Sequence, residues 1–200
     1  MSEIGAKRKV RNLHAAGDEL APARIDDFLQ RQGWMDGMAD AIQQVIGALY
    51  GALGKPGRLL KDALHGTRIL GHPLHPAVTD IPLGAWTVGV MADWAAHVTT
   101  AVPQQVGDFA LAVGVLAGLL AVASGATDFR DTYGHERRYG LTHGLPMTSA
   151  LLVMVAPLGL RSLSVAHGGR LAAPLASVGF VALGVCASFG RTPPCALGRP

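Results

Sequence analysis

Charged residues are scarce in this 200-residue chain, at 16% of the total, against roughly 25% in a typical soluble domain. The shortage is concentrated, because residues 109–127 and 171–190 contain no charged residue at all. Each of these stretches is close to the ~20 residues that a helix needs to cross a bilayer. Such stretches are hard to bury in a small chain without lipid, so the composition argues against a soluble globular domain.

Cysteines are few, and the common catalytic motifs are missing. Cys186 and Cys195 are the two cysteines, and they form neither a disulfide framework nor a C-x-x-C motif. The chain contains no G-x-S-x-G, no phosphate-binding loop and no H-E-x-x-H, which argues against a soluble-type hydrolase. The isoelectric point of about 9.1 comes mostly from the N-terminal segment and residues 128–144. Anionic lipid accounts for this basic charge more simply than nucleic acid, so no nucleic-acid partner is expected.

Four apolar stretches predict transmembrane helices, over residues 76–98, 109–127, 145–165 and 171–190. The first is the least apolar, because it carries Asp80 and Asp93. All are rich in Gly, Ala and Ser, which allow helices to approach closely in lipid. The sequence therefore predicts an all-α protein, with an integral membrane four-helix bundle over residues 71–190 and a short tail over 191–200.

The N-terminal segment, residues 1–70, is predicted to be polar and amphipathic. Within it, residues 34–53 place apolar side chains at helical spacing on one face: Trp34, Met38, Ile42, Val45, Ile46, Leu49 and Leu53. The "GKPGR" sequence at 54–58 is expected to end this helix, and a second short helix is expected over 58–66. Two placements of the amphipathic helix remain open, namely on the membrane surface or against the cytoplasmic side of the bundle.

The distribution of Lys and Arg predicts the orientation in the membrane. Ten of the 17 basic residues precede residue 71, and the loop at 99–107 has none. The loop at 128–144 has three arginines and the loop at 161–170 has two. A multi-pass protein with four spans and both termini in the cytoplasm fits these counts best.

The most unusual stretch is "RILGHPLHPAVTDIPLGAW", from Arg68 to Trp86, where two histidines and two prolines precede an apolar run. Pro76 suits the first turn of a helix, because a backbone N–H would have no helical partner there. We therefore expect the first span to begin at Pro76, with His72 and His75 at the cytoplasmic interface.

A polar stripe is expected on one face of this first span. At about 100° per residue, the stripe contains His75, Thr79, Trp86, Asp93 and His97. Ionisable side chains in mid-membrane normally face a bundle interior or a wet cavity, so the stripe is predicted to point inward. The candidate intramembrane polar residues are Asp80, Asp93, His97 and, from the loop that returns on the same side, Asp128.

Three histidines are candidate cofactor ligands: His72, His75 and His143. Imidazoles near the ends of neighbouring helices are suited to ligating haem iron, here haem b, or a transition metal. A structural role is equally open, because a His-Pro pair can cap a helix start and a histidine at the membrane interface can interact with lipid head groups.

The sequences "LGHPLHPAVTDIPLGAW" and "SGATDFRDTYGHERRYGLTHG", with Asp93 between them, resemble a family of bacterial membrane proteins described as domain of unknown function 2231. The resemblance covers about residues 60–190 and implies four transmembrane helices in the inner membrane. The positions that match the family pattern are His72, Pro73, His75, Pro76, Asp80, Pro82, Gly84, Asp93, Gly125, Asp128, Gly140 and His143.

Some members of that family continue into a Rieske iron–sulfur domain, and this implies a redox setting. A Rieske centre needs two Cys and two His ligands. After residue 190 this chain has Cys195 and no histidine, so no iron–sulfur cluster is expected.

The residues leave three functions open. The first is a membrane scaffold or anchor that holds a redox or membrane partner protein against the lipid bilayer. The second is a b-type haem or quinone-linked electron-transfer protein that uses the interfacial histidines. The third is a metal or proton transporter, since intramembrane ionisable residues mark ion pathways.

Overall fold

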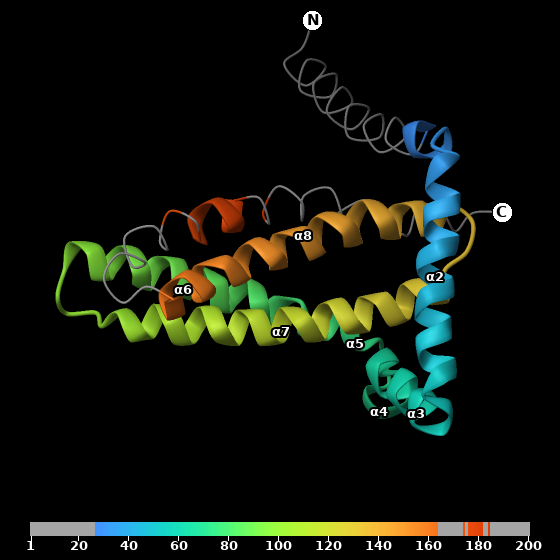
Figure 1. Ribbon diagram of the computed structural model, residues 1–200, viewed down its shortest axis with the longest axis horizontal. Helices are drawn as coiled ribbons and strands as arrows, with labels where there is room; N and C mark the ends of the chain where they lie inside the picture. The colour runs from blue at the N-terminus through green and yellow to red at the C-terminus, as the bar shows by residue number, and fades with distance from the viewer. Residues whose placement is uncertain (1–26, 164–173, 175, 182–183, 185–200) are drawn as a thin grey trace, which may run out of the picture.

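The computed structural model describes residues 27–163, 174, 176–181 and 184, and every regular element in these residues is a helix (Figure 1). The elements are α2 (Trp34–Ala52), α3 (Gly54–His65), α4 (Thr67–Leu70), α5 (Leu74–Val78), α6 (Asp80–Val98), α7 (Gln104–Arg130) and α8 (His135–Leu163). The predicted all-α class is confirmed for this part of the chain. Most of the fourth predicted span, 171–190, lies outside the described residues.

Three long helices, α6, α7 and α8, run side by side and alternate in direction, and α2 runs across one of their ends (Figure 1). We call these three helices the helical body. We call the end where α7 meets α8, at residues 130–135, the α2 end. The α6–α7 connection, residues 99–103, lies at the opposite end.

Glycines on α7 allow α6 and α7 to pack closely. A Cβ on Gly114 would overlap the indole of Trp86, and a Cβ on Gly107 would overlap the carboxylate of Asp93. Trp86 is only 3% exposed and belongs to the buried core, together with Leu111, Ala150, Leu151, Met154 and Ala176. The small residues of α7 therefore receive the large and polar residues of α6, which is how helices pack where lipid supplies no hydrophobic drive between them.

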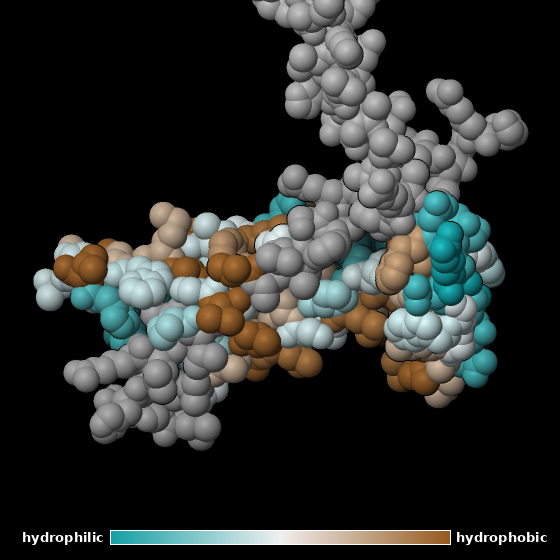
Figure 2. Space-filling view, turned by 90° about the horizontal axis from the view of Figure 1, so that it is seen from above, coloured by the Kyte–Doolittle hydropathy of each residue, from teal (hydrophilic) through white to brown (hydrophobic). Residues whose placement is uncertain are grey.

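Among the described residues, two helices are long and apolar enough to cross a membrane: Gln104–Arg130 and His135–Gly159. The surface of α7 fits lipid, because large apolar side chains are exposed on it: Phe109, Leu116, Leu119 and Leu120. Hydrophobic patches cover parts of the helical body (Figure 2). The first predicted span corresponds to α5 and α6, which do not meet the same criterion, so that span stays a prediction.

Several expected boundaries are wrong. The loop expected at 128–144 is mostly helical, and only residues 131–134 connect α7 to α8. The charged side chains there do not end the helices, because they pair with residues of α2 and α3. The first span does not begin as one helix at Pro76, because Thr79 separates α5 from α6.

The connections before the helical body differ from expectation as well. The "GKPGR" sequence begins α3 instead of separating it from α2, because its proline falls in the first turn of the helix. Gly66 ends α3 with a φ of +77°, and Gly71 ends α4 with a φ of +75°. Glycine adopts this left-handed conformation without a steric penalty, so these two residues supply the sharp turns that lead to α5.

Candidate functional site at the α2 end

An ion pair joins α2 to the start of α8. Arg138 donates from Nε to Asp36 Oδ1 at 2.9 Å and from Nη2 to Asp36 Oδ2 at 2.6 Å. Its remaining nitrogen, Nη1, donates to the backbone carbonyl of Leu29 at 3.0 Å. The hydrogen bond from Arg138 lowers the pKa of Asp36 below its ordinary value. A second pair, Arg137 with Asp40, lies beside the first.

Two further side chains of α2 bind the end of α7. Gln43 Nε2 donates to the carbonyl of Phe129 at 2.8 Å and to that of Thr132 at 3.0 Å. The Tyr50 hydroxyl lies 2.6 Å from Thr127 Oγ1. Because Thr127 Oγ1 donates to the carbonyl of Ala123, the Tyr50 hydroxyl is the donor in that pair. Gln43 and Tyr50 thus connect α2 to the last turns of α7 and to the residues that follow it.

Helix α3 is held against the same end of α7. Lys61 Nζ lies 2.7 Å from Asp131 Oδ2, and His65 Nδ1 lies 2.6 Å from Asp128 Oδ1. Gly57 allows α3 to fold back on α2, because a Cβ there would overlap the carbonyl oxygen of Tyr50. The N-terminal helix pair, α2 and α3, is thus attached to the helical body through side chains from both of its helices.

The structure brings His75 and His143 together, with ring centroids 6.3 Å apart and the rings nearly perpendicular. His75 Nδ1 donates to the carbonyl of Ala121 at 2.8 Å. The ring lies over Gly125, where a Cβ would be 2.9 Å from its Cε1 and Nδ1. His143 Nδ1 is buried and has no hydrogen-bond partner within the described part of the chain.

The other predicted site residues lie elsewhere. His72 is exposed and its Nδ1 donates to the carbonyl of Pro73, so it does not join the pair of histidines. Asp80 is exposed in the first turn of α6, and Asp128 binds His65. Asp93 is 2% exposed and lies against Gly107.

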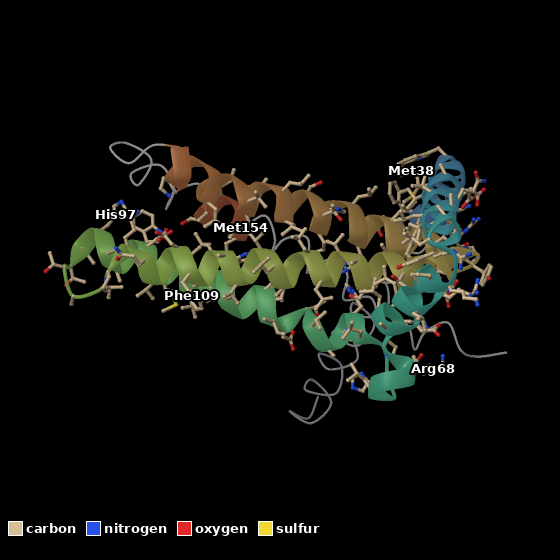
Figure 3. All side chains as sticks on the ribbon, turned by 60° about the horizontal axis from the view of Figure 1, so that its bottom comes forward. Met38, Arg68, His97, Phe109 and Met154 are labelled. Carbon is tan, nitrogen blue, oxygen red and sulfur yellow. The ribbon has the colours of Figure 1, made fainter. Side chains whose placement is uncertain are left out.

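His97 lies at the end of the helical body away from α2, whereas Met38 lies at the α2 end (Figure 3). His97 Nδ1 donates to the carbonyl of Asp93 at 2.9 Å. The described residues hold no group of three or more His, Cys, Asp or Glu side chains arranged for a metal ion.

A polar cleft of about 360 Å³ lies between α2 and the α7–α8 connection, lined by Asp40, Gln43, Gln44, Gly47, Arg130, Asp131 and Tyr133. Gly47 makes room for the guanidinium of Arg130, whose Nε would lie 3.3 Å from a Cβ at that position. Both signs of charge line this cleft, and it opens to the outside at the α2 end.

Sequence reasoning missed the cleft and, apart from Asp128, the attachment residues of the N-terminal helix pair. From the sequence, Arg130, Arg137 and Arg138 were interpreted only as charges that orient the protein in the membrane. A signal was present, because Asp36 and Asp40 are four residues apart and therefore on one face of the predicted helix. That spacing indicates a paired basic segment but does not identify it.

We call the polar contacts of α2 and α3 with the adjoining ends of α7 and α8 the polar junction. These features define a class, namely an all-helical membrane protein whose two apolar helices carry a polar junction at one end. Residues 71–193 match the family described as predicted membrane protein DUF2231, and the chain belongs to that family. The match begins after α2 and α3, so the N-terminal helix pair lies outside it. Neither a curated protein nor a solved structure matches the chain.

Proposed function

We propose that the protein is a scaffold of the inner membrane that presents a docking platform to a partner protein on the cytoplasmic side. The observation that carries this proposal is the attachment of α2 and α3 to α7 and α8. Five of its polar contacts link segments more than sixty residues apart: Asp36–Arg138, Gln43–Phe129, Tyr50–Thr127, Lys61–Asp131 and His65–Asp128. A platform held in this way has a fixed orientation relative to the membrane helices.

The side that faces the partner is the polar cleft. Its lining offers carboxylates, amides, a guanidinium and a phenol, and protein interfaces favour arginine and tyrosine over other polar residues. The basic residues of the first 70 positions, with Arg130 at the end of α7 and Arg137 and Arg138 at the start of α8, favour the cytoplasm for this end of the molecule.

The test is photo-crosslinking in living cells with a benzophenone residue at Gln44, which lines the cleft. The matched control is Leu116, which is exposed on α7 and faces lipid in this proposal. We expect a discrete protein adduct from position 44 and none from position 116. A chain that gives no protein adduct from any cleft position would contradict the docking role.

The alternative is a redox or metal site at His75 and His143. It is favoured by their proximity and by the buried His143 Nδ1. The bond from His75 Nδ1 to a backbone carbonyl is the arrangement that orients a ligating imidazole, and it leaves Nε2 available to bind a metal. His75 and His143 would be the residues that hold a haem or a transition metal there, and a haem would supply one-electron chemistry.

Absorption spectra of the detergent-purified protein, oxidised and then reduced with dithionite, decide between the two functions. The scaffold predicts no haem bands after haem-supplemented expression, and metal analysis that shows no bound transition metal. It also predicts that His75→Ala and His143→Ala change thermal stability alone. Reduced α and β bands that disappear in both variants would establish the redox site instead.

A further inference from the structure

The depth of α2 in the membrane follows from its contacts with α7. The uncharged residues 109–127 of α7 extend about 28 Å as a helix, close to the ~30 Å thickness of the hydrocarbon core. The boundary between hydrocarbon and head groups therefore falls beside Thr127, which binds the Tyr50 hydroxyl. Since α2 runs across the helical body at this level (Figure 1), it lies along the membrane plane.

Helix α2 has three faces. One packs against protein, one is polar and suited to water, and the third is apolar yet exposed. One face is buried on the helical body through Met35 and Ala39. A second face carries the polar side chains that line the cleft. The third is apolar but exposed, with exposed fractions of 65% for Trp34, 68% for Val45 and 60% for Leu49.

Helix α3 repeats this arrangement. Gly57 is buried against α2, while Leu59 and Leu60 are 67% and 46% exposed. Lys55 lies one turn before Leu59 and Arg58 lies across the helix from Leu60. Both are exposed and have no ion pair to any residue that the structure describes. At the end of the molecule that carries α2, hydrophobic surface borders hydrophilic surface (Figure 2).

We infer that α2 and α3 lie in the head-group layer of the bilayer that α7 crosses, with their exposed apolar faces in lipid and Lys55 and Arg58 bound to anionic head groups. Exposed apolar side chains bordered by basic side chains are typical of interfacial helices. The occupant of the apolar faces is lipid, because they lie at the depth where the lipid-exposed surface of α7 ends.

Nitroxide accessibility in the full-length chain tests the placement. In a Cys186→Ser/Cys195→Ser background, single cysteines at Leu49, Leu59 and, as the polar-face control, Gln44 are spin-labelled and reconstituted into phosphatidylcholine vesicles with phosphatidylglycerol. Positions 49 and 59 are expected to be more accessible to oxygen than to a water-soluble nickel chelate, with the reverse at 44. Equal accessibility at all three positions, or shielding of 49 and 59 from both reagents by protein, overturns the inference.

The charge component has its own test, the exchange rate of the α3 backbone amides. Each of Lys55→Gln and Arg58→Gln is expected to speed that exchange about fivefold in vesicles that contain phosphatidylglycerol, because a basic residue near an anionic surface contributes on this scale. Neither substitution is expected to change it in pure phosphatidylcholine. An equal change in both lipids overturns head-group binding.

The inference depends on α7 crossing the bilayer and not on the docking role. Failure to crosslink a partner from Gln44 leaves the nitroxide result unaffected, so the two proposals are tested separately.

Discussion

Replacing Gly114 with alanine is the sharpest test of how α6 and α7 pack. The added Cβ would overlap Trp86, a bulky side chain that is only 3% exposed. Overpacking of this kind costs about 1–3 kcal/mol. Alanine also favours a helix over glycine by about 1 kcal/mol, which offsets part of this cost.

Gly84→Ala is the matched control, because Gly84 lies in α6 and a Cβ there meets nothing within 4 Å. Both substitutions gain the same helix preference, so the difference between them isolates the overpacking. We expect Gly114→Ala to be less stable than Gly84→Ala by about 1–3 kcal/mol. The assay is unfolding of the detergent-purified protein by sodium dodecyl sulfate, followed by circular dichroism.

A third variant establishes that the contact with Trp86 is the cause. Trp86→Ala removes the indole that meets the new Cβ, so Gly114→Ala should carry no overpacking cost in that background, with a coupling energy of about 0.5–3 kcal/mol. Equal stability of Gly114→Ala and Gly84→Ala, or strictly additive effects of the two substitutions at 114 and 86, would refute this packing.

Three further predictions concern the α2 end. Arg138→Gln is expected to speed backbone amide exchange in the first half of α2. Acid should have the same effect on the wild type, because the pKa of Asp36 is lowered in the folded protein. The ion pair then stabilises α2 fully above the pKa that Asp36 has in the unfolded chain, and this stability is lost as the pH falls through the pKa of the folded protein. An exchange rate that is independent of pH in the acidic range would contradict the ion pair. Gly125→Ala should displace His75, whose ring lies 2.9 Å from the new Cβ, and the imidazole NMR signals should shift; unchanged signals would contradict the contact. Tyr50→Phe should cost about 1 kcal/mol in detergent unfolding, and a variant as stable as the wild type would show that this hydrogen bond contributes nothing.

The helices were largely predictable from local patterns. The 3.6-residue spacing of apolar side chains predicts a helix over 34–53, and α2 covers Trp34–Ala52. The apolar face of that pattern does not identify what is buried, however, because Met35 and Ala39 are buried while Trp34 and Leu49 are exposed. The spacing of apolar residues shows which side of a helix is apolar, but it does not distinguish residues buried against protein from residues exposed on the surface.

The polar junction could not be predicted in the same way. Asp36 and Arg138 are 102 residues apart, and no local preference selects one arginine of α8 over its neighbours. The pairing of His75 with His143 was closer to prediction, because both were expected near the ends of neighbouring helices as candidate ligands of one cofactor. Helices α7 and α8 extend beyond the predicted spans, because hydropathy ends a span at its first charges, whereas a helix continues wherever those charges find partners.

The separation between Asp36 and Arg138 also sets an order of events during synthesis. At about 5–20 residues per second, roughly 5–20 s pass between the appearance of Asp36 and that of its partner. Throughout that interval α2 lacks this ion pair, and Val45 and Leu49, exposed even in the finished protein, are available to the membrane. A nascent chain stopped before residue 138 should therefore already associate with membranes through α2, before the junction that later fixes the orientation of this helix exists.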